Sequence, residues 1–169
     1  MLELGKAGSA GTEKGELPVL QDGVLVAVLR AANWREEATA VVGDRQWAFA
    51  KRNGELTARW AAEPEDAVRL RARQASFWKG TWTVDLAGTQ VEVQGASVWK
   101  GTHRFLAGDR QIAESGSTGG WSPRPTLDAD RSLPLEHAVF LLWLELVISR
   151  RNTAVVAGAT GAAVMGGSS

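Results

Sequence analysis

The amino-acid sequence predicts an all-β domain whose strands wrap around one buried helix late in the chain. Between Ala138 and Ile148 only Glu145 is polar, so a helix drawn through this stretch has no face suited to water. The run is shorter than the ~18–20 apolar residues of a membrane crossing, which favours a core helix. The residues from 18 to 127 alternate short strand-like segments with turn signals, at the spacing typical of a sandwich or barrel.

The strands are predicted from alternation and from the turns between them. Asn53-Gly54 is the strongest hairpin signal in the chain. In the segment after it, Leu56, Ala58 and Trp60 alternate with polar residues, as in a strand with one buried face. By the same reasoning we expect strands at residues 17–20, 24–29, 36–42, 45–52, 55–61, 67–74, 76–86, around 91–93, 97–105, around 112 and 121–127.

An internal repeat lies in the second half of this region. Ser76-Phe-Trp-Lys-Gly-Thr-Trp82 recurs 21 residues later as Ser97-Val-Trp-Lys-Gly-Thr-His103, with five of seven positions identical. The repeat could mark a duplicated ligand site, but we favour two strands that face the same central helix. The chain has eight Trp and no Tyr, so Trp is expected to fill the core. The predicted core side chains are Trp78, Trp82, Trp99, Phe140 and Trp143.

The helix is predicted over residues 134–151. Asp130 or Ser132 can cap its start, and Pro134 suits its first turn. Arg150 and Arg151 complement the negative end of the helix dipole. The helix therefore has signals for both of its ends.

One domain is expected over residues 17–151. Residues 1–16 lack periodicity and are predicted to be a flexible segment. Residues 152–169 contain Ala, Gly, Val, Thr and Ser with no charge, so we expect a disordered tail.

A run of short Trp-rich strands followed by LPLEHAVFLLWLELVISRR resembles the tubby-like superfamily, and within it the LURP-one-related branch, over about residues 17–151. The superfamily also includes the phospholipid scramblases. The resemblance implies a closed antiparallel barrel of about twelve strands threaded by the helix, which leaves no exposed strand edges. It implies no general enzymatic activity. No stretch matches the scramblase calcium segment or the phosphoinositide-binding residues of tubby proteins, so no functional residue is transferred by position.

The composition offers little for catalysis. The net charge is zero and there is no Cys, which gives no sign of nucleic-acid binding and excludes thiol chemistry. The two histidines, His103 on an inward strand face and His137 in the first helical turn, are expected to be structural. No spacing resembles a metal site. We therefore predict no catalytic residues, no metal and no cofactor. For Glu145 we favour a pair with a strand Arg, or partial exposure near the rim, over a proton carrier.

The candidate anion-binding residues are the cations Arg69, Arg71 and Arg73, which alternate along one strand, with Lys51 and Arg52 on a neighbouring hairpin. Such a row could hold phosphate oxygens by charge-assisted hydrogen bonds. The alternative is a solvated face that is balanced by nearby acidic residues, among them Glu55, Glu63, Glu65 and Asp66. Trp34, in a loop, could anchor the protein at an interface or cover a barrel end.

These observations favour a non-enzymatic binding module. The first hypothesis is that it binds anionic phospholipid or another phosphate-bearing surface. The alternative is a structural or protein-interaction domain for an unknown protein partner. We expect a monomer that does not bind nucleic acid, and a cytoplasmic location that could be peripheral at the membrane. The abundance of Ala, Gly, Arg and Val is typical of a bacterial protein.

Overall fold

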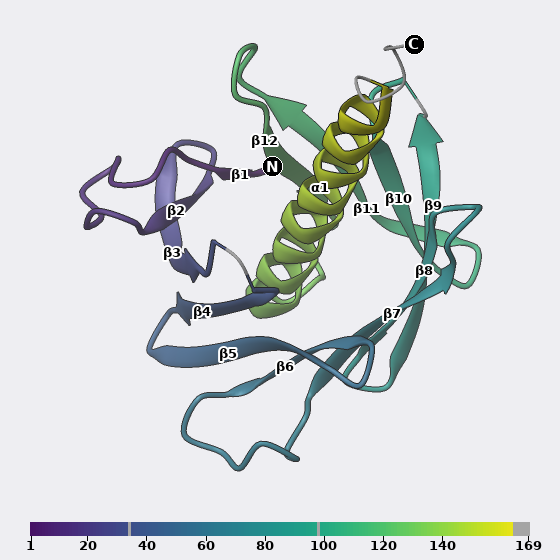
Figure 1. Cartoon of the computed structure of the whole chain (residues 1–169). Coiled ribbons are helices and arrows are strands. Elements are labelled where there is room, and N and C mark those ends of the chain that lie inside the picture. The colour runs from purple at the N-terminus through teal and green to yellow at the C-terminus, as the bar shows by residue number, and fades with distance from the viewer. Residues whose placement is uncertain (34, 98, 164–169) are drawn as a thin grey trace, which may run out of the picture.

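Twelve antiparallel strands form a closed barrel around one helix in the computed structural model (Figure 1), which describes residues 1–33, 35–97 and 99–163. This confirms the predicted fold class. The strands are β1 Leu2–Leu4, β2 Leu17–Gln21, β3 Val24–Ala31, β4 Glu37–Val42, β5 Arg45–Arg52, β6 Glu55–Trp60, β7 Leu70–Ser76, β8 Thr81–Leu86, β9 Thr89–Ser97, β10 Thr102–Ala107, β11 Arg110–Thr118 and β12 Arg124–Ala129. Each pairs with its neighbour in sequence, and β1 pairs with β12 to close the ring.

The strands form where the sequence alternates. Along β4, Ala38, Ala40 and Val42 are buried and the residues between them are exposed. The turn at Asn53-Gly54 places both residues at positive φ, 49° and 84°. This conformation matches the right-handed twist of the flanking strands. Side-chain periodicity and turn chemistry therefore agree on the register of this part of the barrel.

The helix α1, Leu135–Ala163, runs through the ring of strands and supplies the centre of the core. Phe140 and Trp143 are 0% and 1% exposed, and Trp82 on β8 is 2% exposed. Phe49 of β5 packs against both helix rings, with centroids 5.6 Å from Phe140 and 5.1 Å from Trp143. Trp82, Phe140 and Trp143 are thus core residues, as predicted. Among the described residues, no helix has the length and apolar character needed to cross a membrane.

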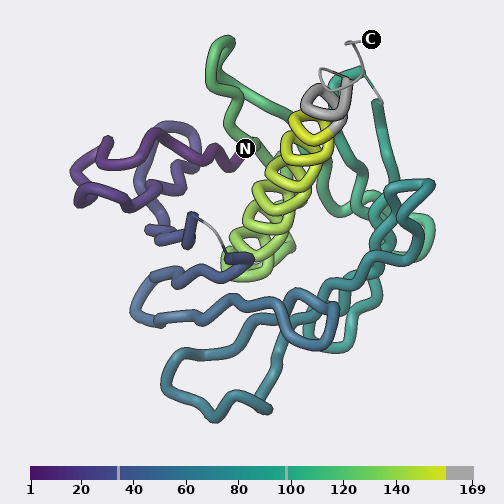
Figure 2. The backbone as a smooth tube through the Cα atoms, viewed as in Figure 1, coloured from purple at the N-terminus to yellow at the C-terminus, as the bar shows by residue number. Residues whose placement is uncertain are grey.

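Both ends of the chain contain more regular structure than the sequence predicted. Residues 1–16 were expected to be flexible, but Leu2 and Leu4 of β1 are buried and complete the barrel wall. The helix continues past Arg151 to Ala163, so residues 152–163 are helical where a disordered tail was expected. Figure 2 shows this helix leaving the barrel as a continuous tube. Residues 164–169, also part of the predicted tail, lie outside the described residues.

Candidate functional site

Three hairpins and the C-terminal part of α1 share one end of the barrel. In an antiparallel ring, the connections that follow odd-numbered strands lie at one end and those that follow even-numbered strands lie at the other. The helix follows β12 and runs back through the ring, so it emerges beside the β7–β8, β9–β10 and β11–β12 hairpins. Clefts between the helix and these hairpins support this arrangement, since one is lined by Phe77 and Val156 and another by Lys100 and Thr153.

The internal repeat forms two equivalent hairpin turns, and not two inward-facing strands. Ser76 pairs with Thr81, and Ser97 pairs with Thr102 in the second copy. The Ser76 hydroxyl accepts a hydrogen bond from the Lys79 amide at 3.2 Å, and Ser97 accepts the equivalent bond at 3.3 Å. The Gly of each copy has a φ near 60°, a conformation that strongly favours Gly. The two copies of the repeat therefore form the same turn geometry.

The prediction that Trp78 and Trp99 belong to the core is wrong, because these turns carry both side chains into solvent. Trp78 is 93% exposed and Trp99 is 98% exposed. Trp121, predicted to lie in a strand, is fully exposed in the β11–β12 connection. Phe77 is 71% exposed and packs edge-on against Trp78, with ring centroids 5.9 Å apart. Isolated exposed apolar side chains are ordinary, but three exposed Trp at one end of a small barrel are not.

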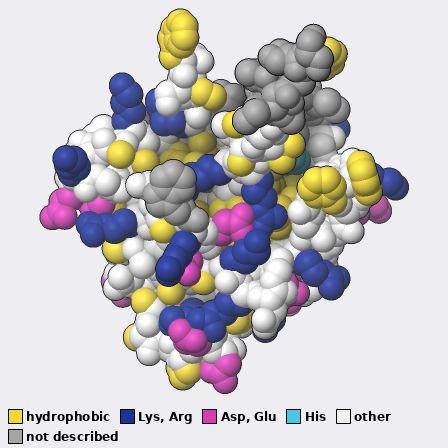
Figure 3. Space-filling model, viewed as in Figure 1, with side chains coloured by type: hydrophobic (Ala, Val, Ile, Leu, Met, Phe, Trp, Pro, Cys, Tyr) yellow, Lys and Arg dark blue, Asp and Glu magenta, His cyan; other side chains and the backbone are white. Residues whose placement is uncertain are grey.

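The helix adds apolar surface to the same end. Val155 and Val156 are 63% and 67% exposed, and no residue from 152 to 163 carries a charge. We call the surface formed by Phe77, Trp78, Trp99, Trp121, Val155 and Val156 the tryptophan end. Figure 3 shows hydrophobic side chains standing out from the molecular surface, with Lys and Arg side chains nearby.

Two lysines lie within the repeated turns. Lys79 follows Trp78 and Lys100 follows Trp99, and both residues are exposed. Within the described part of the chain neither Lys forms an ion pair, whereas nine of the other seventeen Lys and Arg residues do. The tryptophan end therefore combines apolar rings with uncompensated positive charge.

The predicted arginine row carries mostly compensated charge. Arg69 lies 2.6 Å from Glu63 and also stacks on Trp60, with its guanidinium carbon 3.3 Å from the ring centroid. The remaining pairs are Arg71 with Glu55 at 3.4 Å, Arg52 with Glu65 at 2.7 Å and Lys51 with Glu36 at 3.2 Å. Arg73 alone among the five has no such partner among the described residues. This distribution favours the solvated, charge-balanced face over an anion site.

The helix carries one buried carboxylate, Glu145, which is 5% exposed. It does not pair with an Arg and is not partly exposed, so both favoured sequence predictions for this residue are wrong. Its partner is His103 of β10, whose Nδ1 lies 3.1 Å from Oε2 and 3.0 Å from Oε1. His103 is buried, as predicted, and its amide donates to the Ser115 hydroxyl at 2.8 Å. Two polar side chains on facing elements thus meet inside the barrel near its tryptophan end.

A second polar contact holds the helix where it leaves the barrel. The Arg151 guanidinium donates two hydrogen bonds to the carboxylate of Glu36, and Lys51 lies 3.2 Å from the same carboxylate. The hydrogen bonds from Arg151 lower the pKa of Glu36 below its ordinary value of 4.5, and Lys51 acts in the same direction, while partial burial opposes the shift. Arg150 donates to the Ala32 carbonyl at 2.9 Å. These contacts tie the β3–β4 connection to α1.

The lowered pKa of Glu36 predicts a pH-dependent contribution to stability. A depressed pKa stabilises the folded state above the unfolded value, and the contribution is lost as the pH falls through the folded value. Wild type should therefore exceed Glu36→Gln in unfolding free energy by about 1 kcal/mol at pH 6.5, with the gap closing towards pH 3. Urea unfolding at both pH values measures the gap. Glu37→Gln, on the exposed neighbour, is the control, and a gap for Glu36→Gln that stays constant with pH would contradict the assignment.

Several sequence predictions concern features that are not part of this surface. Trp34 lies outside the described residues. Within the described ranges, no group of three or more His, Asp or Glu side chains could hold a metal ion. His137 is half-buried at the opposite end of α1, where burial lowers its pKa.

Comparison with protein-family models, with curated proteins and with solved structures gave no match. The resemblance to the tubby-like superfamily therefore stays a prediction.

Proposed function

We propose that the protein is a non-enzymatic module that binds the surface of an anionic lipid bilayer through its tryptophan end. The observation that carries the proposal is the exposure of Trp78, Trp99 and Trp121 on three hairpins beside the emerging helix. Trp is the side chain that most favours the boundary between acyl chains and headgroups, because its ring is apolar and its indole N–H can donate a hydrogen bond.

The energy available from these side chains is large enough for peripheral binding. A Trp side chain can bury roughly 150–250 Å², and apolar burial contributes about 25 cal/mol per Å². Burying half of each ring therefore favours binding by about 2 kcal/mol per Trp, before the cost of association is subtracted. Lys79 and Lys100 add about 1 kcal/mol each at an anionic surface. The Trp rings supply most of the affinity, and the lysines supply the preference for anionic lipid.

The shape of this end favours a bilayer over a protein partner. The three Trp project from separate hairpins, and the apolar residues of the α1 extension, Val155 and Val156, lie beside one of them at Phe77. A fluid interface can accept several separate projections at once. A folded partner would need a matching cavity for each. The uncharged helical segment 152–163 can enter the headgroup region without desolvating any charged side chain.

The proposal is tested by flotation of the purified protein with liposomes of phosphatidylcholine, with and without phosphatidylserine, at low and high salt. We expect binding to phosphatidylserine vesicles that weakens with salt, and at least a tenfold loss for Trp78→Ala/Trp99→Ala/Trp121→Ala. Lys79→Glu/Lys100→Glu should abolish the preference for anionic lipid.

Two further variants separate this surface from the rest of the barrel. Val24→Ala/Leu25→Ala/Val41→Ala removes exposed apolar residues near the connections that follow β2 and β4, at the opposite end, and should leave binding unchanged. Arg69→Glu/Arg71→Glu tests the arginine row and should have only a small effect. Absence of flotation under every condition would refute the lipid proposal and make a protein partner the leading hypothesis. Loss of binding only in Arg69→Glu/Arg71→Glu would show that the lipid-binding site lies at the arginine row and not at the tryptophan end.

A further inference from the structure

The buried carboxylate of Glu145 is incompletely satisfied. A carboxylate presents about four acceptor positions, whereas the Nδ1 of His103 can donate one hydrogen. Nδ1 lies 3.1 Å from Oε2 and 3.0 Å from Oε1, so its one hydrogen leaves one carboxylate oxygen without a full hydrogen bond from the described residues. Buried polar groups are almost always hydrogen-bonded, and an unpaired buried acceptor costs about 1–3 kcal/mol. Glu145 therefore lacks at least one donor.

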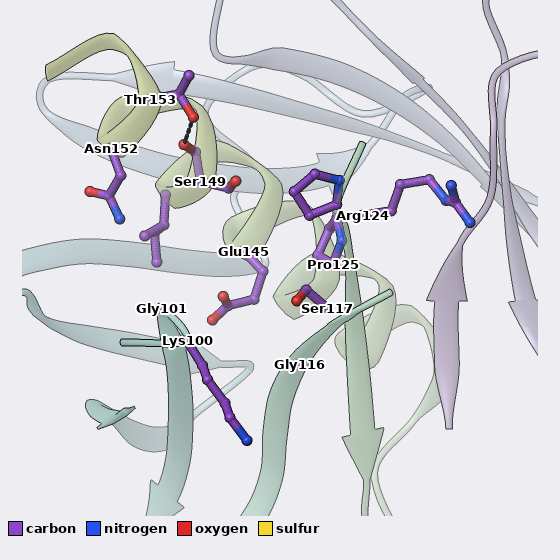
Figure 4. A pocket seen from close by; sticks show the side chains of 12 residues that line it. Lys100, Gly101, Gly116, Ser117, Arg124, Pro125, Glu145, Ser149, Asn152 and Thr153 are labelled. Atoms are coloured by element: carbon purple, nitrogen blue, oxygen red, sulfur yellow. Dashed lines mark hydrogen bonds between the residues drawn. The ribbon is translucent and has the colours of Figure 1, made fainter. Parts of the chain in front are cut away.

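Glu145 also forms part of the wall of a cleft that opens at the tryptophan end. The cleft has a volume of about 220 Å³ and lies between α1 and the ends of β10, β11 and β12. Figure 4 shows the Glu145 carboxylate directed from the helix towards this space, with Ser117 of β11 and Lys100 of the β9–β10 turn also in its lining. The volume is below the ~300–1,000 Å³ of sites for drug-sized ligands. It suits a molecule the size of a lipid headgroup.

The lining side chains indicate the chemistry of the ligand. Beyond the acceptor of Glu145, the cleft presents the hydroxyls of Ser117 and Ser149 and the side-chain amide of Asn152. A primary ammonium group has three N–H donors and a positive charge, so it can satisfy Glu145 and two of these acceptors together. A quaternary ammonium has no N–H and would leave one oxygen of the Glu145 carboxylate without a donor.

Lys100 also lines this cleft. Its free cation suits an anionic group on the ligand, attached a few bonds from the ammonium. Arg124 also lines the cleft, but its guanidinium is directed to Glu3 and to the Leu4 carbonyl. The cleft therefore contains an acceptor for the ammonium, Glu145, and one available cation, Lys100.

We propose that this cleft binds a primary-ammonium compound that carries a phosphate a few bonds away, with Glu145 as the acceptor for the ammonium. Phosphoethanolamine has this chemistry, both as a free solute and as the headgroup of ethanolamine phospholipids. The proposal does not depend on bilayer binding, because the free solute can reach the cleft in either case.

The first test is isothermal titration of the full chain with O-phosphoethanolamine, ethanolamine and phosphocholine. We expect the primary amines to bind, phosphoethanolamine more tightly than ethanolamine, and phosphocholine at least tenfold more weakly than phosphoethanolamine. Equal binding of phosphoethanolamine and phosphocholine would overturn the assignment of Glu145 as ammonium acceptor. Absence of binding by both primary amines would overturn the site. This comparison uses wild type and is independent of how variants fold.

The second test is Glu145→Gln, which keeps the shape of the side chain and removes its charge. Phosphoethanolamine should bind at least tenfold more weakly to this variant, while Glu92→Gln on the exposed face of β9 should bind like wild type. Circular dichroism checks that both variants are folded. Unchanged affinity in folded Glu145→Gln would refute the proposal.

A third comparison separates the two sources of the ligand. Vesicles of phosphatidylcholine alone and vesicles that contain phosphatidylethanolamine are both zwitterionic, so they differ in the ammonium and not in net charge. Preference for phosphatidylethanolamine that disappears in Glu145→Gln would identify a lipid headgroup. Solute binding without this preference would identify a free amine. The variant that lacks the three exposed Trp should still bind the solute even when it no longer floats with vesicles, so failure of one proposal is distinguishable from failure of the other.

Discussion

Replacing Trp143 by Ala is expected to lower the free energy of unfolding by about 3–5 kcal/mol. Trp143 is 1% exposed and lies at the centre of the core, with its ring centroid 5.1 Å from Phe49 and 5.9 Å from Phe140. Because α1 is enclosed by strands, the neighbours of this ring are held by the barrel wall and can close the resulting cavity only in part. The substitution therefore loses both apolar burial and packing contacts.

Urea unfolding followed by far-UV circular dichroism measures this change. Trp121→Ala is the matched control, since it removes the same side chain from a fully exposed position and should change stability by no more than about 0.5 kcal/mol. Similar losses for the two variants would contradict the placement of Trp143 at the centre of a single core.

Replacing His103 by Leu is expected to cost about 3–5 kcal/mol, because it leaves the Glu145 carboxylate buried without its donor. His103 and Glu145 are 8% and 5% exposed, so the cleft beside Glu145 gives water little access to the carboxylate. Glu145→Leu should cost less, about 1–3 kcal/mol, because the imidazole it leaves unpaired is polar but can be neutral.

A double-mutant cycle isolates the interaction between the two side chains. His103→Leu/Glu145→Leu should be more stable than His103→Leu alone, since replacing both members of a buried pair by apolar groups removes the unpaired charge. The same urea experiment provides all four values. If the two single losses simply add in the double variant, the contact between His103 and Glu145 does not contribute to stability.

The fold was largely predictable because the two periodicities are strong. Runs such as Leu56, Ala58 and Trp60 indicate half-buried strands, and the apolar stretch from Ala138 to Ile148 requires an enclosed helix. The closing strand β1 was missed because it has only three residues. Such a strand is stabilised by pairing with β12, more than 120 residues away in the sequence. Local sequence patterns do not encode a pairing over that distance.

The candidate site was not predicted, because the repeat was interpreted as two inward-facing strands and it forms two turns. The prediction of one continuous strand over residues 76–86 puts Trp78 and Trp82 on the same inward face. A turn within the run places one Trp in solvent and the other in the core. The signal was present, because Ser followed by Lys-Gly-Thr at a fixed interval provides a turn acceptor and a Gly for positive φ. The arginine row was found, but its acidic partners come from other strands and loops.

The position of α1 in the chain affects the way the protein is made. All twelve strands precede α1, which supplies the centre of the core, and the ring closes only when the first strand meets the last. During synthesis the ribosome thus releases a long series of strands before Phe140 and Trp143 appear. We expect these strands to stay unfolded until the helix follows, because long-range pairing is slow and has no core to stabilise it. A nascent chain of this protein should therefore depend on chaperones until α1 has emerged.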